Sequence, residues 1–81
     1  MIYVYGTHAK LRMVERDISL EAVESLLSGF SEVIVAPSKT DPEIDLVMGF
    51  YEGKGYVVIV NRVSQKIVTL RRARDVDRRR R

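Results

Sequence analysis

The chain has 81 residues, of which 46% are hydrophobic and 31% charged, and its formal net charge is +3. This composition predicts one folded domain with room for one modest core. The chain has no cysteine and one histidine, which excludes disulfides, thiolate metal sites and a multi-histidine metal centre within one chain. No apolar run approaches the roughly 18–20 residues of a membrane-spanning helix, so we expect no contact with a membrane. The absence of cysteine fits a cytoplasmic setting, and we expect neither a metal nor a cofactor.

The first part of the chain predicts a short strand and then a helix. Residues 1–5 alternate Ile, Tyr and Val and end at Gly6, as a short strand does. Thr7 is suited to cap a helix over residues 8–16. A helical spacing predicts the buried positions of this segment, which are Leu11, Val14 and Ile18. A polar stripe at the spacing i, i+4, i+8 contains His8, Arg12 and Arg16.

A second helix is predicted over residues 20–28. Ser19 is suited to cap its beginning and Gly29 to end it in the left-handed conformation. Its predicted core positions are Leu20, Val23, Leu26 and Leu27. Two helices that follow one another this closely should lie on the same face of a sheet.

The second half of the chain predicts strands over residues 32–36, 44–52, 56–62 and 67–72, rich in Val, Ile, Tyr and Thr. Short connections at residues 53–55 and 63–66 favour antiparallel pairing. We expect an α+β domain over residues 1–74: a short N-terminal strand, two helices, and a four-stranded antiparallel meander packed on the helices. The other face of the sheet should be half solvated, with polar residues at Asp45, Glu52, Arg62, Thr69 and Arg71. An unpaired strand edge could support a homodimer or strand addition by a partner.

Positive charge is concentrated at the end of the chain. Seven of residues 71–81 are arginines beside two aspartates, a net +5, whereas residues 1–70 sum to −2, with seven Lys/Arg against nine Asp/Glu. A basic tail over residues 75–81 follows the predicted domain. Such asymmetry is typical of contact with a polyanion, most often nucleic acid.

The segment from Thr7 to Glu24 resembles the opening of the family named domain of unknown function 4258. The shared pattern is H-A-x-x-R-M-x-E-R-G-I-S-x-E-x-V, and the residues that align with it are His8, Ala9, Arg12, Met13, Glu15, Arg16, Ile18, Ser19, Glu21 and Val23. Asp17 replaces the glycine that is usual at this position of the family. A glycine there implies a left-handed turn, and aspartate tolerates that conformation better than most residues do.

This resemblance implies a layout similar to that of the RelE/ParE toxins, with a basic C-terminal end similar to that of BrnT-type chains. Members of that group are mostly free or ribosome-associated mRNA endonucleases, each neutralised by an antitoxin peptide. The family named above has no assigned activity. The implied function is therefore a toxin-type, metal-independent endoribonuclease whose partners are RNA, the ribosome and an antitoxin-like protein.

RNA cleavage of this kind needs a base, an acid and cations that stabilise phosphorane charge. Only His8 has an ordinary pKa near neutrality, and arginine can stabilise charge but hardly serves as a base. The candidate catalytic residues are His8, Arg62 and Arg71. The candidate nucleic-acid-binding residues are Arg12, Arg16, Tyr51, Tyr56, Arg72, Arg74 and Arg78.

Structural roles for the same residues stay open. His8 could bond a neighbouring strand, Arg12 and Arg16 could pair with Glu15 or a sheet carboxylate, and the tyrosines could pack in the sheet. The alternative function is a non-catalytic module that binds nucleic acid or a protein through the cationic end. A catalytic site should bring His8 or a tyrosine near Arg62 and Arg71, whereas a binding module should leave these groups dispersed or in structural bonds.

Overall fold

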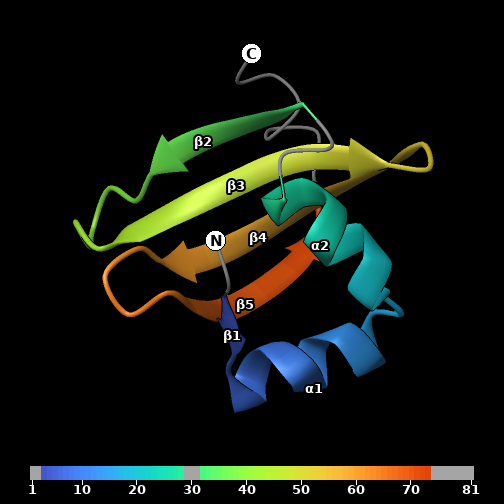
Figure 1. The fold of residues 1–81 in the computed structure, drawn as a ribbon, viewed down its shortest axis with the longest axis horizontal. Helices are drawn as coiled ribbons and strands as arrows, with labels where there is room; N and C mark the ends of the chain where they lie inside the picture. Colours follow the sequence, from blue (N-terminus) through green and yellow to red (C-terminus); the bar gives the residue numbers. More distant parts are fainter. Residues whose placement is uncertain (1–2, 29–31, 74–81) are drawn as a thin grey trace.

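The computed structural model describes residues 3–28 and 32–73, which form two helices on one face of a five-stranded sheet (Figure 1). In chain order the elements are β1 (Val4–Tyr5), α1 (Thr7–Glu15), α2 (Leu20–Leu27), β2 (Val33–Pro37), β3 (Ile44–Tyr51), β4 (Lys54–Asn61) and β5 (Lys66–Arg72). Across the sheet the strands follow the order β1-β5-β4-β3-β2. The expected α+β class is confirmed.

The sheet is mixed, whereas the prediction was a four-stranded antiparallel meander with no partner assigned to the N-terminal strand. The pairs β2–β3, β3–β4 and β4–β5 are antiparallel, but β1 is parallel to β5, with Val4 opposite Lys66 and Tyr5 opposite Ile67. A strand of two residues has too little side-chain pattern to indicate its partner. No helix in the described part of the chain is long and apolar enough to cross a membrane.

Helix α1 packs on β5 with a different side from the one that its apolar spacing predicted. Ala9 is fully buried and Met13 packs against the core, whereas Leu11 is 51% exposed and Val14 is 81% exposed. Because alanine has a single methyl group, this side of the helix can lie close to the strand. Ile18 is buried as predicted, but it reaches the core from the turn after the helix.

The turn between the helices depends on Asp17 and Ser19. Asp17 has a φ of 52°, the left-handed conformation predicted for this position. The Ser19 hydroxyl accepts a hydrogen bond from the Ala22 N–H at 3.2 Å, so the predicted N-cap of α2 is confirmed. The predicted cap of α1 is wrong by one residue, because Gly6 holds the N-cap position and Thr7 already belongs to the helix.

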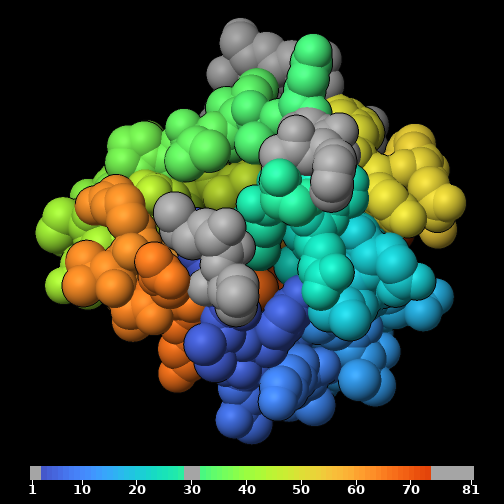
Figure 2. Space-filling model, viewed as in Figure 1, coloured from blue at the N-terminus to red at the C-terminus, as the bar shows by residue number. Residues whose placement is uncertain are grey.

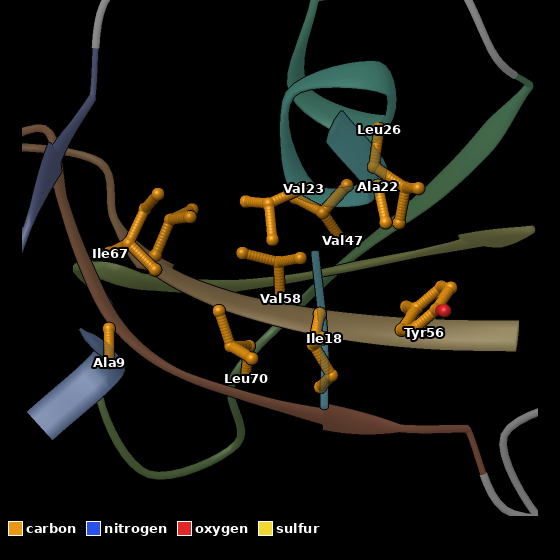
Figure 3. Close-up of a cluster of buried hydrophobic side chains, with 11 residues drawn as sticks. Ala9, Ile18, Ala22, Val23, Leu26, Val47, Tyr56, Val58, Ile67 and Leu70 are labelled. Carbon is orange, nitrogen blue, oxygen red and sulfur yellow. The ribbon is translucent and has the colours of Figure 1, made fainter. Parts of the chain in front are cut away.

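The core lies between the sheet and the two helices (Figure 3). Helix α2 contributes Val23 and Leu26, as predicted, together with Ala22. Leu20, which was predicted for the core, is exposed, and the predicted cap at Gly29 lies outside the described residues. The sheet contributes residues that point to the same side: Val47, Tyr56, Val58, Val60, Ile67 and Leu70. Side chains alternate along β3 and β4. In β5 the irregularity of the ladder opposite Ile59 and Val60 brings Ile67 and Leu70, three residues apart, to the same side.

The other face of the sheet, here called the helix-free face, is more apolar than predicted. In β3, Val47 points towards the helices, so alternation places Asp45 on the helix side as well. The helix-free face receives Leu46, Met48 and Phe50 instead. Alternation alone favours the other choice, because one side of residues 44–51 carries Ile44, Leu46, Met48 and Phe50, whereas the other carries Asp45, Val47, Gly49 and Tyr51. Packing of the whole sheet therefore decided which side faces the helices.

Strand β1 is held by backbone bonds and by the Tyr5 side chain. The N–H groups of Val4 and Gly6 donate to the carbonyls of residues 65 and 67, at 2.8 Å and 3.2 Å. Tyr5 packs against the core. Burial raises the pKa of the Tyr5 phenol, and the Glu24 carboxylate raises it further, so the folded chain favours the neutral phenol.

We predict that Tyr5→Phe makes the protein less sensitive to alkaline unfolding. Because the folded-state pKa lies above the ordinary value of 10.0, the contribution of Tyr5 to stability is present below that value. It is lost as the pH rises through the folded-state pKa. Urea midpoints measured between about pH 9 and about pH 12 should fall more steeply for the wild type than for Tyr5→Phe. Equal slopes for the wild type and Tyr5→Phe would contradict the prediction.

The different burial of Leu26 in α2 and Leu11 in α1 predicts different effects for the same substitution, leucine to alanine. Leu26 is 1% exposed, so Leu26→Ala should lower the free energy of unfolding by about 2–5 kcal/mol. Leu11 is half exposed, so Leu11→Ala should cost less than about 1 kcal/mol. Urea denaturation of both variants measures the difference. Similar losses at the two positions would show that Leu11 belongs to the core.

Candidate nucleic-acid interface

His8 and Arg71, two of the predicted catalytic residues, lie near opposite ends of β5. Helix α1 begins beside the start of this strand, because Gly6 donates to the Ile67 carbonyl, and His8 is exposed in the first turn of the helix. Arg71 lies four residues beyond Ile67, roughly 13 Å along an extended strand. Alternation also points Arg71 to the helix-free face, whereas α1 covers the other face. The structure therefore does not bring these side chains together.

Arg71 and Arg72, which were predicted to form one phosphate-contacting cluster, point to opposite faces of the sheet. Arg72 is opposite Tyr56 in the ladder, and its guanidinium carbon lies 5.4 Å from the centre of the Tyr56 ring, a cation–π contact on the helix side. Arg71 is opposite Val57 on the helix-free face, and its guanidinium donates to the Arg72 carbonyl at 3.2 Å. The end of β5 is thus cationic on both faces, but the two groups do not converge.

Arg62, the third predicted catalytic residue, makes structural contacts. Its guanidinium donates to Asp45 Oδ1 at 2.9 Å and to the carbonyl oxygen of Pro42. Its backbone N–H donates to the Glu43 carbonyl at 2.8 Å. These bonds join the end of β4 to the loop that precedes β3. The sequence did not reveal this pair, because the two residues become neighbours only through the register of β3 and β4.

Arg12 and Arg16 lie on α1 beside its buried side. The Arg12 guanidinium donates to Glu15 Oε1 at 2.5 Å, so the ion pair considered from the sequence is present. Arg16 is exposed and forms the C-cap of α1, where a positive charge interacts favourably with the helix dipole. Both residues lie on the helix side of the molecule, whereas Arg71 lies on the other.

Neither predicted stacking tyrosine offers an open ring. Tyr56 is 6% exposed, packs in the core and carries Arg72 over its ring. Gly49 lies opposite Tyr56 in the ladder, and a Cβ at Gly49 would lie 3.0 Å from Val33 Cγ1 and 3.4 Å from Leu26 Cγ, so the glycine lets Val33 and Leu26 approach the sheet. Tyr51 packs against the core and is partly buried. The pair of Tyr56 and Arg72 could have been found from the sequence only by aligning the three last strands in register.

The remaining predicted binding residues, Arg74 and Arg78, lie outside the described residues, as does the predicted boundary between residues 74 and 75. Their charge is known from the sequence. In the part of the chain that the structure describes, no three His, Cys, Asp or Glu side chains are grouped as metal ligands.

Comparisons with models of known protein families, with curated proteins and with solved structures returned no match. The resemblance of residues 7–24 to the family named domain of unknown function 4258 stays a prediction.

The contacts of Arg62 predict a structural role that a double-mutant cycle can measure. Arg62→Gln and Asp45→Asn should each lower the free energy of unfolding, with a coupling energy of about 0.2–1 kcal/mol because the pair is near the surface. The coupling should decrease at high salt. A coupling energy near zero, together with loss of RNA binding in Arg62→Gln alone, would instead assign Arg62 to the ligand site.

Proposed function

We propose that this chain is an RNA-associated binding module that contacts RNA through the cationic end of β5 and the arginine-rich residues that follow. The observation that carries the proposal is the placement of Arg71 and Arg72. Ile67 and Leu70 anchor β5 in the core, and the strand then presents one arginine to each face just before residues 74–81. Those eight residues add five arginines and two aspartates.

Contact with the phosphate backbone suits this arrangement. Release of counterions from RNA depends on how many cations approach the phosphates, and a fixed arrangement of those cations is not required. The opposite signs of residues 1–70 and 71–81 would orient the chain on a polyanion. Because the Tyr56 ring is covered, stacking of bases on this residue does not contribute, and binding should depend little on sequence.

The separation of the candidate catalytic groups supports binding over cleavage. Metal-independent cleavage needs an acid and a base at the same phosphate. His8 lies at the beginning of α1, Arg62 is bonded to Asp45, and Arg71 lies on the helix-free face. This dispersal is the pattern expected of a binding module.

A second candidate is a toxin-type endoribonuclease with the RelE-like layout. The order of a short strand, two helices and four further strands, together with the resemblance of residues 7–24, supports it, and His8 is exposed where a substrate could reach it. In this proposal the chain acts in the cytoplasm on RNA or the ribosome and is neutralised by an antitoxin-like protein.

Binding to a fluorescent single-stranded RNA at several salt concentrations tests the first proposal. Arg71→Gln/Arg72→Gln should weaken binding and reduce the slope of log K against log salt by about 1.4, or about 0.7 for each phosphate that the chain no longer neutralises. Lys10→Gln/Lys39→Gln removes two exposed charges elsewhere and should leave the slope close to that of the wild type. Equal slopes for both double variants would show that the end of β5 is not the RNA site.

Cleavage of mRNA in a translating extract tests the second candidate. If the chain is an endoribonuclease, the wild type should cleave, and His8→Ala should abolish cleavage while RNA binding persists. Arg12→Ala serves as the control on the same helix, because Arg12 is occupied by Glu15. No cleavage by the wild type, alongside salt-sensitive binding, would leave the binding module as the function.

A further inference from the structure

The sheet has two outer edges, and they differ in length. β1 forms one edge with two residues and is flanked by α1. β2 forms the other edge with five residues, and no described strand lies beyond it (Figure 1). In Figure 2, which views the molecule from the helix side, the green atoms of β2 lie in the upper part of the molecule. A long unpaired edge can pair with another strand.

The ladder between β2 and β3 determines which backbone groups of β2 face outward. Ser38 N–H donates to the Ile44 carbonyl at 2.9 Å, so residues 38 and 44 form a hydrogen-bonded pair in this register. Because such pairs alternate along an antiparallel ladder, Ile34 and Ala36 also bond to β3. The N–H and C=O groups of Val33 and Val35 therefore point away from the sheet.

Apart from Pro37 at its end, β2 has no residue that protects this edge. The sequence Val-Ile-Val-Ala-Pro has no charge, Val35 is 56% exposed and Ile34 is 37% exposed. Edges are usually protected by charges, bulges or proline. The irregularity in the ladders lies between β4 and β5, away from this edge, and within β2 only Pro37 lacks an N–H.

We propose that β2 pairs with β2 of a second copy of this chain, antiparallel and centred on Ile34. In this register the N–H of Val33 donates to the carbonyl of the second copy's Val35, the N–H of Val35 donates to the carbonyl of the second copy's Val33, and each bond occurs twice by symmetry. A register centred on Val35 would place Pro37 opposite Val33, whose carbonyl would then lack a donor. The two Ile34 side chains face one another on the helix-free face.

Charge and geometry favour a second copy as the occupant. An uncharged strand is complementary to itself, whereas a charged peptide would find no opposite charge on it. The two β5 strands would lie seven strand spacings apart, about 34 Å, so repulsion between Arg71 and Arg72 of the two copies would be screened. The two β3 strands, over which the α2 helices lie, would be about 14 Å apart, which exceeds the 8–10 Å of packed helices and avoids a clash.

Disulfide trapping tests the register, because the natural chain has no cysteine. In the proposed pairing the two Ile34 Cα atoms form a non-hydrogen-bonded pair about 4.5 Å apart, within disulfide range. Ile34→Cys should therefore give a covalent dimer under mild oxidation. In Val35→Cys the two Cα atoms would be about 8 Å apart and should not link. Failure of Ile34→Cys to link, or more efficient linking of Val35→Cys, would overturn the proposed register.

Sedimentation equilibrium tests the interface without cysteine. Between about 10 μM and about 500 μM the wild type should shift towards the dimer, and Val35→Lys should stay monomeric at every concentration. Val63→Lys adds the same charge at a 69% exposed position in the turn after β4 and should dimerise like the wild type. A monomeric wild type, or a dimer that persists in Val35→Lys, would overturn the proposal. RNA binding plays no part in this readout, so its outcome is separate from that of the RNA experiment.

Discussion

Strand β5 is the element on which most of the molecule depends. Ile67 and Leu70 are fully or almost fully buried on its helix side, where Ala9 brings α1 onto the sheet. The same strand pairs with β4 on one side and with the two-residue β1 on the other. Because its core positions are fixed by packing, the faces to which its terminal residues point are fixed as well. The burial of Ile67 and Leu70 therefore determines both the packing of the core and the faces on which the charged residues at the end of β5 lie.

That constraint shapes the electrostatics of the chain. Once Leu70 points into the core, Arg71 must point to the helix-free face and Arg72 to the helix side. Arg72 then lies over Tyr56, a contact that covers an aromatic ring and holds a cation at the surface. A strand end with one arginine on each face can lie against an extended polyanion, but it cannot surround one phosphate group.

The two faces of the sheet differ because helices cover only one of them, and the strands differ in charge. The helices cover one face, the cationic end belongs to β5, and the uncharged edge belongs to β2, three strands away. In an assembly formed through β2, Arg71 and Arg72 of the two copies would therefore lie far apart. Two such ends on one assembly would act together on a long polyanion, since linked sites raise the effective concentration of each other.

The sequence by itself determined the elements and the charge asymmetry. Val and Ile runs indicated β2, β3, β4 and β5, and the Ser19 cap marked the start of α2. These features depend on a few neighbouring residues, so local pattern is sufficient to predict them.

Tertiary structure alone decided which side of each element is buried and which side chains meet. Leu11 and Val14 have the apolar spacing of a core face, yet Ala9 and Met13 occupy the core, because close approach to β5 favours the small side chain. The contacts of Arg62 with Asp45 and of Arg72 with Tyr56 join residues on different strands. Such contacts follow from strand register, which depends on packing of the whole sheet and cannot be read from one strand at a time.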